Sequence, residues 1–254
     1  SVARALLQAG ANPHHTFRDR RTALDFAREV NERYASEDFL LVTYQPEGDL
    51  FSQAVLDELR QLRSELAGVA TVSSVFSILD APLLYSPPVT VDGIADGLPT
   101  LLDEGVDRNL AAREFLESPI YSGLLTNADN SVTALLVNLQ RDQTYFDLLQ
   151  VRDDLREMQR NEGLDSDQVS RLQAAERQFD NYKLTVNEQQ ERLVDEVRGI
   201  LDGYQDNATV YLGGVPMIAV DLISFVKNDL VVFGSGILAF IVSFNHAQHS
   251  DLVL

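Results

Sequence analysis

The 254-residue sequence contains no cysteine and has few basic residues for its length. Without cysteine it can form no disulfide, no zinc–cysteine site and no thiol nucleophile. Its 20 Lys and Arg residues stand against 39 Asp and Glu residues, which gives a formal net charge of −19. Because nucleic acid is bound by basic surfaces, this charge argues against nucleic acid as a partner.

The sequence also lacks the motifs of the common catalytic sites. It has no GxSxG nucleophile elbow, no P-loop, no HExxH and no dinucleotide-binding fingerprint. We therefore predict no enzyme activity, no cofactor and no catalytic residue. Four carboxylates of the region 143–203 are interpreted as a solvated helix face: Asp153, Asp154, Glu191 and Asp195.

Two groups of histidines have spacings that could suit a metal ion. They are His14–His15, and His246 and His249 with Asp251. Neither group has a fourth ligand or a fixed scaffold, so we interpret both as solvated and predict no metal site. The triplet Asn207-Ala-Thr matches a glycosylation acceptor, which would function only on a eukaryotic secretory route.

What the sequence does contain is a regular alternation of strands and helices. The segment "DFLLVTYQ" (38–45) predicts a buried strand, and residues 69–78 predict another. Between them, residues 51–69 predict an amphipathic helix with Ser52 as N-cap and Gly68 as terminator. Its apolar stripe comprises Val55, Leu56, Leu59, Leu62 and Leu66. A strand, a helix of this length and a strand make a βαβ unit.

The following part of the chain, up to residue 214, repeats the order strand, helix, strand. After an irregular connector (79–108) and a short helix (109–118), residues 123–140 predict a β-hairpin that turns at "NADN". Apolar residues at heptad spacing predict a long helical hairpin at about 143–203, and residues 208–214 predict a last strand. The seam comprises Leu148, Val151, Leu155, Met158, Val169, Leu172, Phe179, Val186, Leu193, Val197 and Ile200. The predicted fold class is α+β, with the ferredoxin-like split βαβ order and a helical hairpin insertion.

The chain then becomes apolar. Residues 230–244 carry no charge, and Val215 to Phe244 would form a helix of about 45 Å at about 1.5 Å per residue. We predict an amphipathic start at residue 215 that becomes part of a transmembrane helix after Asp229, followed by a polar tail at 245–254. A buried core helix of a soluble fold is the alternative. Residues 1–27 resemble part of an ankyrin repeat at "AGANP" and "TAL", with a capped amphipathic helix as the other interpretation.

Several stretches of the sequence are similar to one family of membrane proteins. "REVNERYASEDFLLVTYQPEGDLFSQAVLDELRQLRSELAGVATVSSVFSILDAPLL", "SPIYSGLLTNADNSVTALLVNLQRD" and "LGGVPMIAVDLISFVKNDLVVFG" resemble the first extracytoplasmic domain of exporters of the resistance-nodulation-division superfamily, in the MMPL/Patched-like branch, and its passage into the second transmembrane helix. The resemblance covers about residues 22–242.

The resemblance implies a proton-driven exporter of hydrophobic or amphipathic molecules in a bacterial inner membrane. Residues 28–214 would be its periplasmic porter domain, and residues 215–244 would enter the lipid bilayer. By the same likeness Gly213, Gly214 and Pro216 form a hinge-like passage into the membrane helix, and Asp221 occupies an acidic position of the family. The proton-relay carboxylates of the superfamily lie in later transmembrane helices, so no proton-coupling residue is assigned.

Two other interpretations remain open at this point. The chain could be a soluble protein–protein interaction module that uses ankyrin-like and coiled-coil surfaces. Separately, the helical hairpin could bind other subunits, although polar residues in its seam weaken that idea because they cost stability.

Overall fold

The structure is a computed structural model that describes residues 38–85 and 98–250 and, in the last helix, side chains up to Ile237. Contacts divide the chain into two units, Ser1–Asp38 and Phe39–Leu254. The ankyrin-like fragment predicted at residues 1–27 lies outside the described residues, as does part of the predicted connector, residues 86–97. The helices and strands named below all belong to the second unit.

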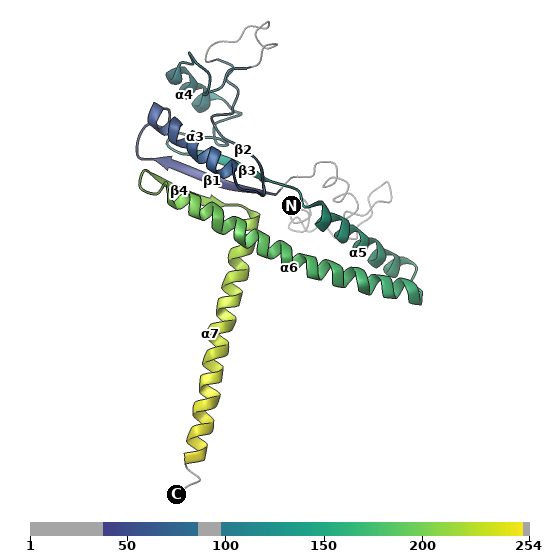
Figure 1. The fold of residues 1–254 in the computed structure, drawn as a ribbon. Helices are drawn as coiled ribbons and strands as arrows, with labels where there is room; N and C mark the ends of the chain where they lie inside the picture. Colours follow the sequence, from purple (N-terminus) through teal and green to yellow (C-terminus); the bar gives the residue numbers. More distant parts are fainter. Residues whose placement is uncertain (1–37, 86–97, 251–254) are drawn as a thin grey trace. The chain divides into compact units, whose positions relative to one another are not determined.

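The second unit is an α+β fold built on one antiparallel sheet. Its four strands lie in the order β2-β3-β1-β4 (Figure 1). They are β1 (Phe39–Pro46), β2 (Val72–Phe76), β3 (Thr133–Leu139) and β4 (Ala208–Gly213). β1 and β3 are the central pair, and β2 and β4 form the edges. The predicted fold class α+β is confirmed, and the strands predicted at 38–45, 69–78 and 208–214 are present.

Helix α3 (Gln53–Ala67) forms where the sequence predicts it. The Ser52 side chain accepts the N–H of Val55, and Gly68 caps the other end. Four leucines of the stripe are at most 2% exposed: Leu56, Leu59, Leu62 and Leu66. Burying each such side chain contributes about 1.5–3 kcal/mol of transfer free energy. The stripe therefore fixes α3 on the sheet.

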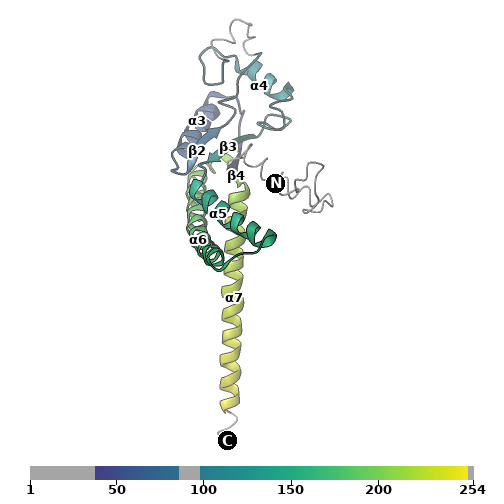
Figure 2. The same ribbon diagram turned by 90° about the vertical axis from the view of Figure 1, so that its right-hand side faces the viewer.

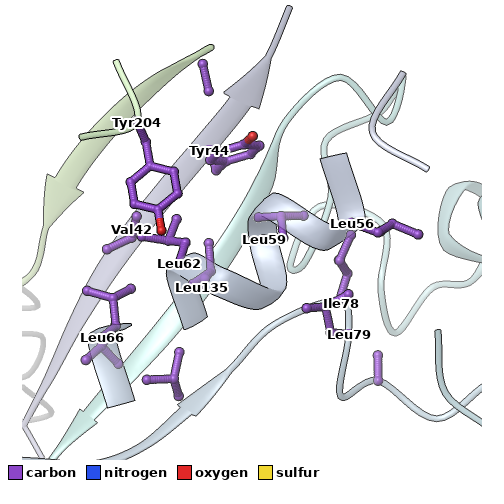
Figure 3. Packing of buried hydrophobic residues seen from close by; sticks show 14 of the residues in the cluster. Val42, Tyr44, Leu56, Leu59, Leu62, Leu66, Ile78, Leu79, Leu135 and Tyr204 are labelled. Atoms are coloured by element: carbon purple, nitrogen blue, oxygen red, sulfur yellow. The ribbon is translucent and has the colours of Figure 1, made fainter. Parts of the chain in front are cut away.

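The main core lies between the sheet and the helices that cover one of its faces. Val42 and Tyr44 of β1 point into it, together with Leu135 of β3 and the leucines of α3 (Figure 3), and Leu40 of β1 belongs to the same buried cluster. Helix α6 (Ser166–Asp202) packs on the same side of the sheet as α3 (Figure 2) and adds Leu193, Val197 and Leu201. Burial raises the pKa of Tyr44, and its hydroxyl donates a 2.8 Å hydrogen bond to Glu58 Oε1, which raises it further.

A buried carboxylate attaches the segment after β2 to helix α4 (Arg108–Glu117). Glu114 is 6% exposed, and its two oxygens accept the backbone N–H groups of Leu84 at 2.6 Å and Tyr85 at 3.0 Å. The Tyr121 hydroxyl donates to the carbonyl of Pro82 in the same segment. Hydrogen bonds to a charged group are about twice as strong as neutral ones. Glu114 therefore holds a segment that has no regular secondary structure.

The predicted helical hairpin is present. Helix α5 (Gln143–Asn161) lies beside the first half of α6 (Figure 1), and α6 begins at a capping box made by Asp165 and Gln168. Toward the tip the two helices bury Leu155, Leu172 and Ala175 against each other. At the base the ring of Phe179 lies 5.3 Å from that of Tyr145, and Arg152 stacks on its face at 4.1 Å.

The heptad seam is wrong at several positions. Val151 is 52% exposed, Met158 38% and Val169 37%, although all three were assigned to the seam. A hairpin of two helices buries one stripe on each, here the stripe of Leu155 on α5 and of Leu172 on α6. The flanking apolar positions would be covered only by a further helix, and the described residues place none there.

The β-hairpin predicted at 123–140 is also wrong in its first arm. Only the second arm forms a strand, β3, and it pairs with β1 and β2. The preceding residues form turns because their polar groups are satisfied locally. The Asn127 side-chain oxygen accepts the N–H groups of Ser131 and Val132, and the Tyr121 carbonyl accepts those of Leu124 and Leu125.

The apolar C-terminal segment is a single helix, α7 (Val215–Ser250). It covers the predicted helical range 215–244 and continues for six more residues, into the segment predicted as a polar tail. No helix in the described part of the chain combines the length and the apolar character needed to cross a membrane. The transmembrane character predicted for residues 215–244 therefore has no support in the structure.

Candidate functional site

The four residues singled out by the family resemblance lie together at the junction of β4 and α7. Gly213 ends β4 opposite Leu41 of β1. Gly214 follows with φ +120°, and a Cβ atom there would lie 2.7 Å from the Phe39 carbonyl oxygen and 3.1 Å from Leu40 Cα. Only glycine fits this approach without moving backbone. The chain can therefore leave the sheet edge and start a helix within one residue.

The first turns of α7 are packed on the body. Pro216 occupies the second helical position, where a missing N–H costs no hydrogen bond, and it is buried. Val220 is 6% exposed, and Met217 packs on the main core. The Ile218 N–H donates to the carbonyl of Gly214 and closes the first turn.

Two ion pairs then join α7 to α6. Arg198 Nη2 donates to both carboxylate oxygens of Asp221 at 2.9 Å, and Lys227 Nζ lies 3.6 Å from Glu191. The Arg198 and Asp221 side chains are 41% and 34% exposed, so this pair contributes at most about 1 kcal/mol. The partners advance along α7 while they recede along α6, and the two helices diverge beyond these pairs (Figure 1). The two pairs connect the start of α7 with the C-terminal half of α6.

Beyond Asp221 the described surface of α7 is exposed and mostly apolar, apart from Ser224, Lys227, Asn228, Asp229 and Ser235. All the described side chains from Leu222 to Ile237 are exposed. The large apolar ones among them are Leu222, Ile223, Phe225, Val226, Leu230, Val231, Val232, Phe233 and Ile237. The last charge before the uncharged run is Asp229, for which the structure records no ion pair among the described residues. Side chains of this kind are normally buried, so an extended exposed apolar surface marks a place of contact.

The other candidate residues do not join this site. Among the described residues no group of three His, Asp or Glu side chains could hold a metal ion. The side chains of His14, His15, His246, His249 and Asp251 lie outside those that the structure describes. Asn207 is exposed in the turn before β4, and its amide donates to Glu58 Oε2 at 3.3 Å.

Sequence reasoning missed the residues that fix the junction. Arg198 was not singled out, and Glu191 was interpreted as part of a solvated face; its side chain is 46% exposed and also pairs with Lys227. The sequence contains a signal for these pairs. Asp221 and Lys227 are six residues apart on α7, and their partners Arg198 and Glu191 are seven residues apart on α6. Glu114 had no comparable signal, because a glutamate in a short helix is ordinarily solvated.

The junction has the geometry of a mechanical attachment: a tight glycine turn, a buried proline and two ion pairs. It brings together no nucleophile and base, and no set of ligands. Compared with known proteins, the chain matches no family model, no curated protein and no solved structure at a significant level.

Proposed function

We propose that the second unit is the extracytoplasmic porter domain of a proton-driven exporter, and that α7 carries the chain from this domain into the bilayer. The exporter would belong to the resistance-nodulation-division superfamily, in its MMPL/Patched-like branch, and would move hydrophobic or amphipathic molecules across a bacterial inner membrane. Support comes from the strand order β4-β1-β3-β2 with helices after β1 and β3, which is the ferredoxin-like split βαβ arrangement. Further support comes from the sequence resemblance.

One observation carries the proposal. In a chain of net charge −19, α7 exposes large apolar side chains on every side from Leu230 to Ile237, directly after the charged residues Lys227 and Asp229. A helix that packs on a protein core buries one stripe and exposes polar residues on its other faces. A helix that is apolar all round is expected to be surrounded, by lipid or by other helices.

Lipid is the surrounding that the rest of the helix favours. The uncharged run extends from Leu230 to Phe244 and has Ile237 at its centre. An aspartate at the centre of a membrane helix costs about 2.5–3.5 kcal/mol on insertion scales, and the lost isoleucine adds about 0.5 kcal/mol. A single Ile237→Asp change should therefore weaken partitioning into a bilayer on the order of 100-fold.

The test is flotation of the full chain with vesicles of uncharged phosphatidylcholine, so that the acidic charge of the protein is not repelled by the lipid. The wild type should float with the vesicles, and Ile237→Asp should remain at the bottom of the gradient. Leu184→Asp is the matched control, because Leu184 on α6 is 63% exposed against 60% for Ile237 and the change adds the same charge. Leu184→Asp should float like the wild type.

Two outcomes would contradict the proposal. A wild-type chain that stays monodisperse without detergent and does not float would favour the soluble interaction module. Equal flotation of Ile237→Asp and wild type would show that the apolar run is not in contact with lipid. If the wild type floats and Ile237→Asp does not, the transported molecule is to be identified separately, in the intact exporter.

A further inference from the structure

The sheet has a second face, opposite the one covered by α3 and α6. Side chains alternate along each strand, and on β1 the even-numbered residues point into the main core. The odd-numbered residues and their paired neighbours form the other face, called the open face below. It comprises Phe39, Leu41, Thr43, Gln45, Ser74, Phe76, Ala134, Leu136, Asn138, Thr209, Tyr211 and Gly213.

The open face is uncharged, and it is apolar at its centre, with polar residues at Thr43, Gln45, Ser74, Asn138 and Thr209. None of its twelve positions carries Asp, Glu, Lys or Arg, although the whole chain has 20 Lys and Arg residues and 39 Asp and Glu residues. Phe39 is 43% exposed, Phe76 36% and Tyr211 67%, and Leu41 and Leu136 between them are partly exposed. An antiparallel sheet that faces water on one side normally alternates apolar and polar residues. This sheet is apolar on both faces at its centre.

We propose that the open face is the interface of a two-fold homodimer, in which two copies of the chain pack their sheets face to face. The proposal does not rest on the exporter function, because it concerns a different surface from the exposed part of α7. Three features of the face favour a second copy of this chain as the partner: its lack of charge, its twist and its arrangement of large and small side chains.

Charge favours this face over the rest of the surface. Two copies that each carry a charge of −19 repel each other, and an interface that brings carboxylates together adds a desolvation cost. The open face is a surface across which two copies can meet without burying any charged group. Salt should strengthen the contact, since it screens the repulsion between the remaining carboxylates.

Twist makes the face complementary to itself. Two sheets with the same right-handed twist pack with their mean strand directions within about 30° of each other and interdigitate their side chains over about 10 Å. Four strands about 4.8 Å apart and about six residues long at about 3.4 Å per residue give a patch of roughly 400 Å² in projection. The patches of two copies together amount to roughly 800 Å², below the about 1,200 Å² at which stable specific interfaces begin, so we expect a weak dimer.

The order of side chains across the sheet fits a two-fold axis that runs along the strands between β3 and β1. One row across the four strands reads Phe76, Leu136, Leu41 and Gly213. Rotation about this axis places Phe76 of one copy over Gly213 of the second copy, and Leu136 over Leu41. The largest side chain of the row therefore meets the position that has none. In the next row Ala134 and Thr43 are small at the centre, where the two sheets are closest.

Chemical cross-linking of single-cysteine variants tests the proposal, because the chain has no cysteine of its own. Thr43→Cys places a thiol at the centre of the open face. Ser64→Cys is the matched control, since Ser64 is an exposed small polar residue of α3 on the opposite side of the sheet. With a short bis-maleimide on the full chain in detergent, Thr43→Cys should give at least tenfold more covalent dimer than Ser64→Cys.

A second variant ties the dimer to this face. Tyr211→Glu adds a carboxylate at a side chain that is already 67% exposed, so the fold tolerates it. In the Thr43→Cys background it should reduce cross-linking at least tenfold. Equal yields from Thr43→Cys and Ser64→Cys, as α7-mediated association would produce, overturn the proposal. So does the absence of any covalent dimer from Thr43→Cys, whether or not its thiol reacts with a monofunctional maleimide.

Discussion

Gly214 is the residue of the β4–α7 junction whose replacement has the clearest expected effect. Its φ of +120° lies in a region that side-chain-bearing residues rarely adopt. The atoms around it belong to the backbone of β1 and cannot move without disturbing the sheet. Gly213 provides a matched comparison one residue earlier, since its φ is not positive and a Cβ there would lie 3.7 Å from the Leu41 carbonyl oxygen, an ordinary contact.

The magnitude follows from two separate costs. A non-glycine residue held in an unfavourable backbone region costs about 1–3 kcal/mol. Inserting a methyl group where the nearest backbone atoms would be 2.7 and 3.1 Å away adds an overpacking cost of about 1–3 kcal/mol. Gly214→Ala should therefore lower the free energy of unfolding by about 2–6 kcal/mol. Gly213→Ala should change it by less than about 1 kcal/mol, because an unstrained alanine also restricts the unfolded chain.

Equilibrium urea unfolding of the full chain, followed by far-ultraviolet circular dichroism, measures both changes. For a chain of this size 1 kcal/mol corresponds to about 2–4 °C in Tm, so Gly214→Ala should also lower Tm by roughly 5 °C or more. If Gly213→Ala were as destabilising as Gly214→Ala, the close approach to Phe39 would not be what requires glycine. If neither variant lost stability, the junction would not be a fixed part of the fold.

Two further predictions concern the domain body. Glu114→Gln should lower the free energy of unfolding by about 2–3 kcal/mol, because an amide nitrogen would replace one of the oxygens that accept the N–H groups of Leu84 and Tyr85. Glu117→Gln is the control, because Glu117 is exposed, and it should have no effect in the same urea experiment. Equal losses from the two variants would contradict the anchoring role of Glu114. Alkaline pH should destabilise the protein, because burial raises the pKa of Tyr44 and the unfolded state ionises first, from its ordinary pKa near 10. The contribution of Tyr44 should be complete below about pH 10 and then be lost by up to about 1.4 kcal/mol per pH unit, in addition to that of Tyr204, whose pKa burial also raises. Tyr44→Phe should make the decline shallower, and an unchanged slope would show that Tyr44 does not titrate with unfolding.

Local signals predicted most of the regular elements. The Ser52 cap and the leucine stripe of α3 were identified from sequence, and the helical hairpin predicted at about 143–203 is formed by α5 and α6, Gln143–Asn161 and Ser166–Asp202. These features depend on residues close together in the chain, such as a cap and its third neighbour or apolar residues three and four apart. The predicted fold class followed from their order.

Tertiary contacts explain what sequence reasoning missed. Val151 has the spacing of a seam residue, but its burial depends on a neighbouring helix that the described part of the chain does not provide. The turn around Asn127 replaces a predicted strand because side-chain hydrogen bonds compete with a β ladder. At the junction, Gly214 could be recognised as a turn residue, whereas its contact with Phe39 depends on the pairing of β1 with β4.

The distribution of charge connects the two proposals and also keeps them separate. A chain with 39 acidic residues leaves two surfaces without charge in the described residues: the part of α7 after Asp229 and the open face of the sheet. The first is a helix that is apolar all round, which suits lipid or other helices, and the second is a flat, one-sided surface, which suits another sheet. Each predicts a different response to one added carboxylate. Ile237→Asp should abolish flotation and leave the Thr43→Cys cross-link intact, whereas Tyr211→Glu should do the reverse. If either change abolished both, a single apolar contact would account for both observations, and the assignment of two partners to two surfaces would be wrong.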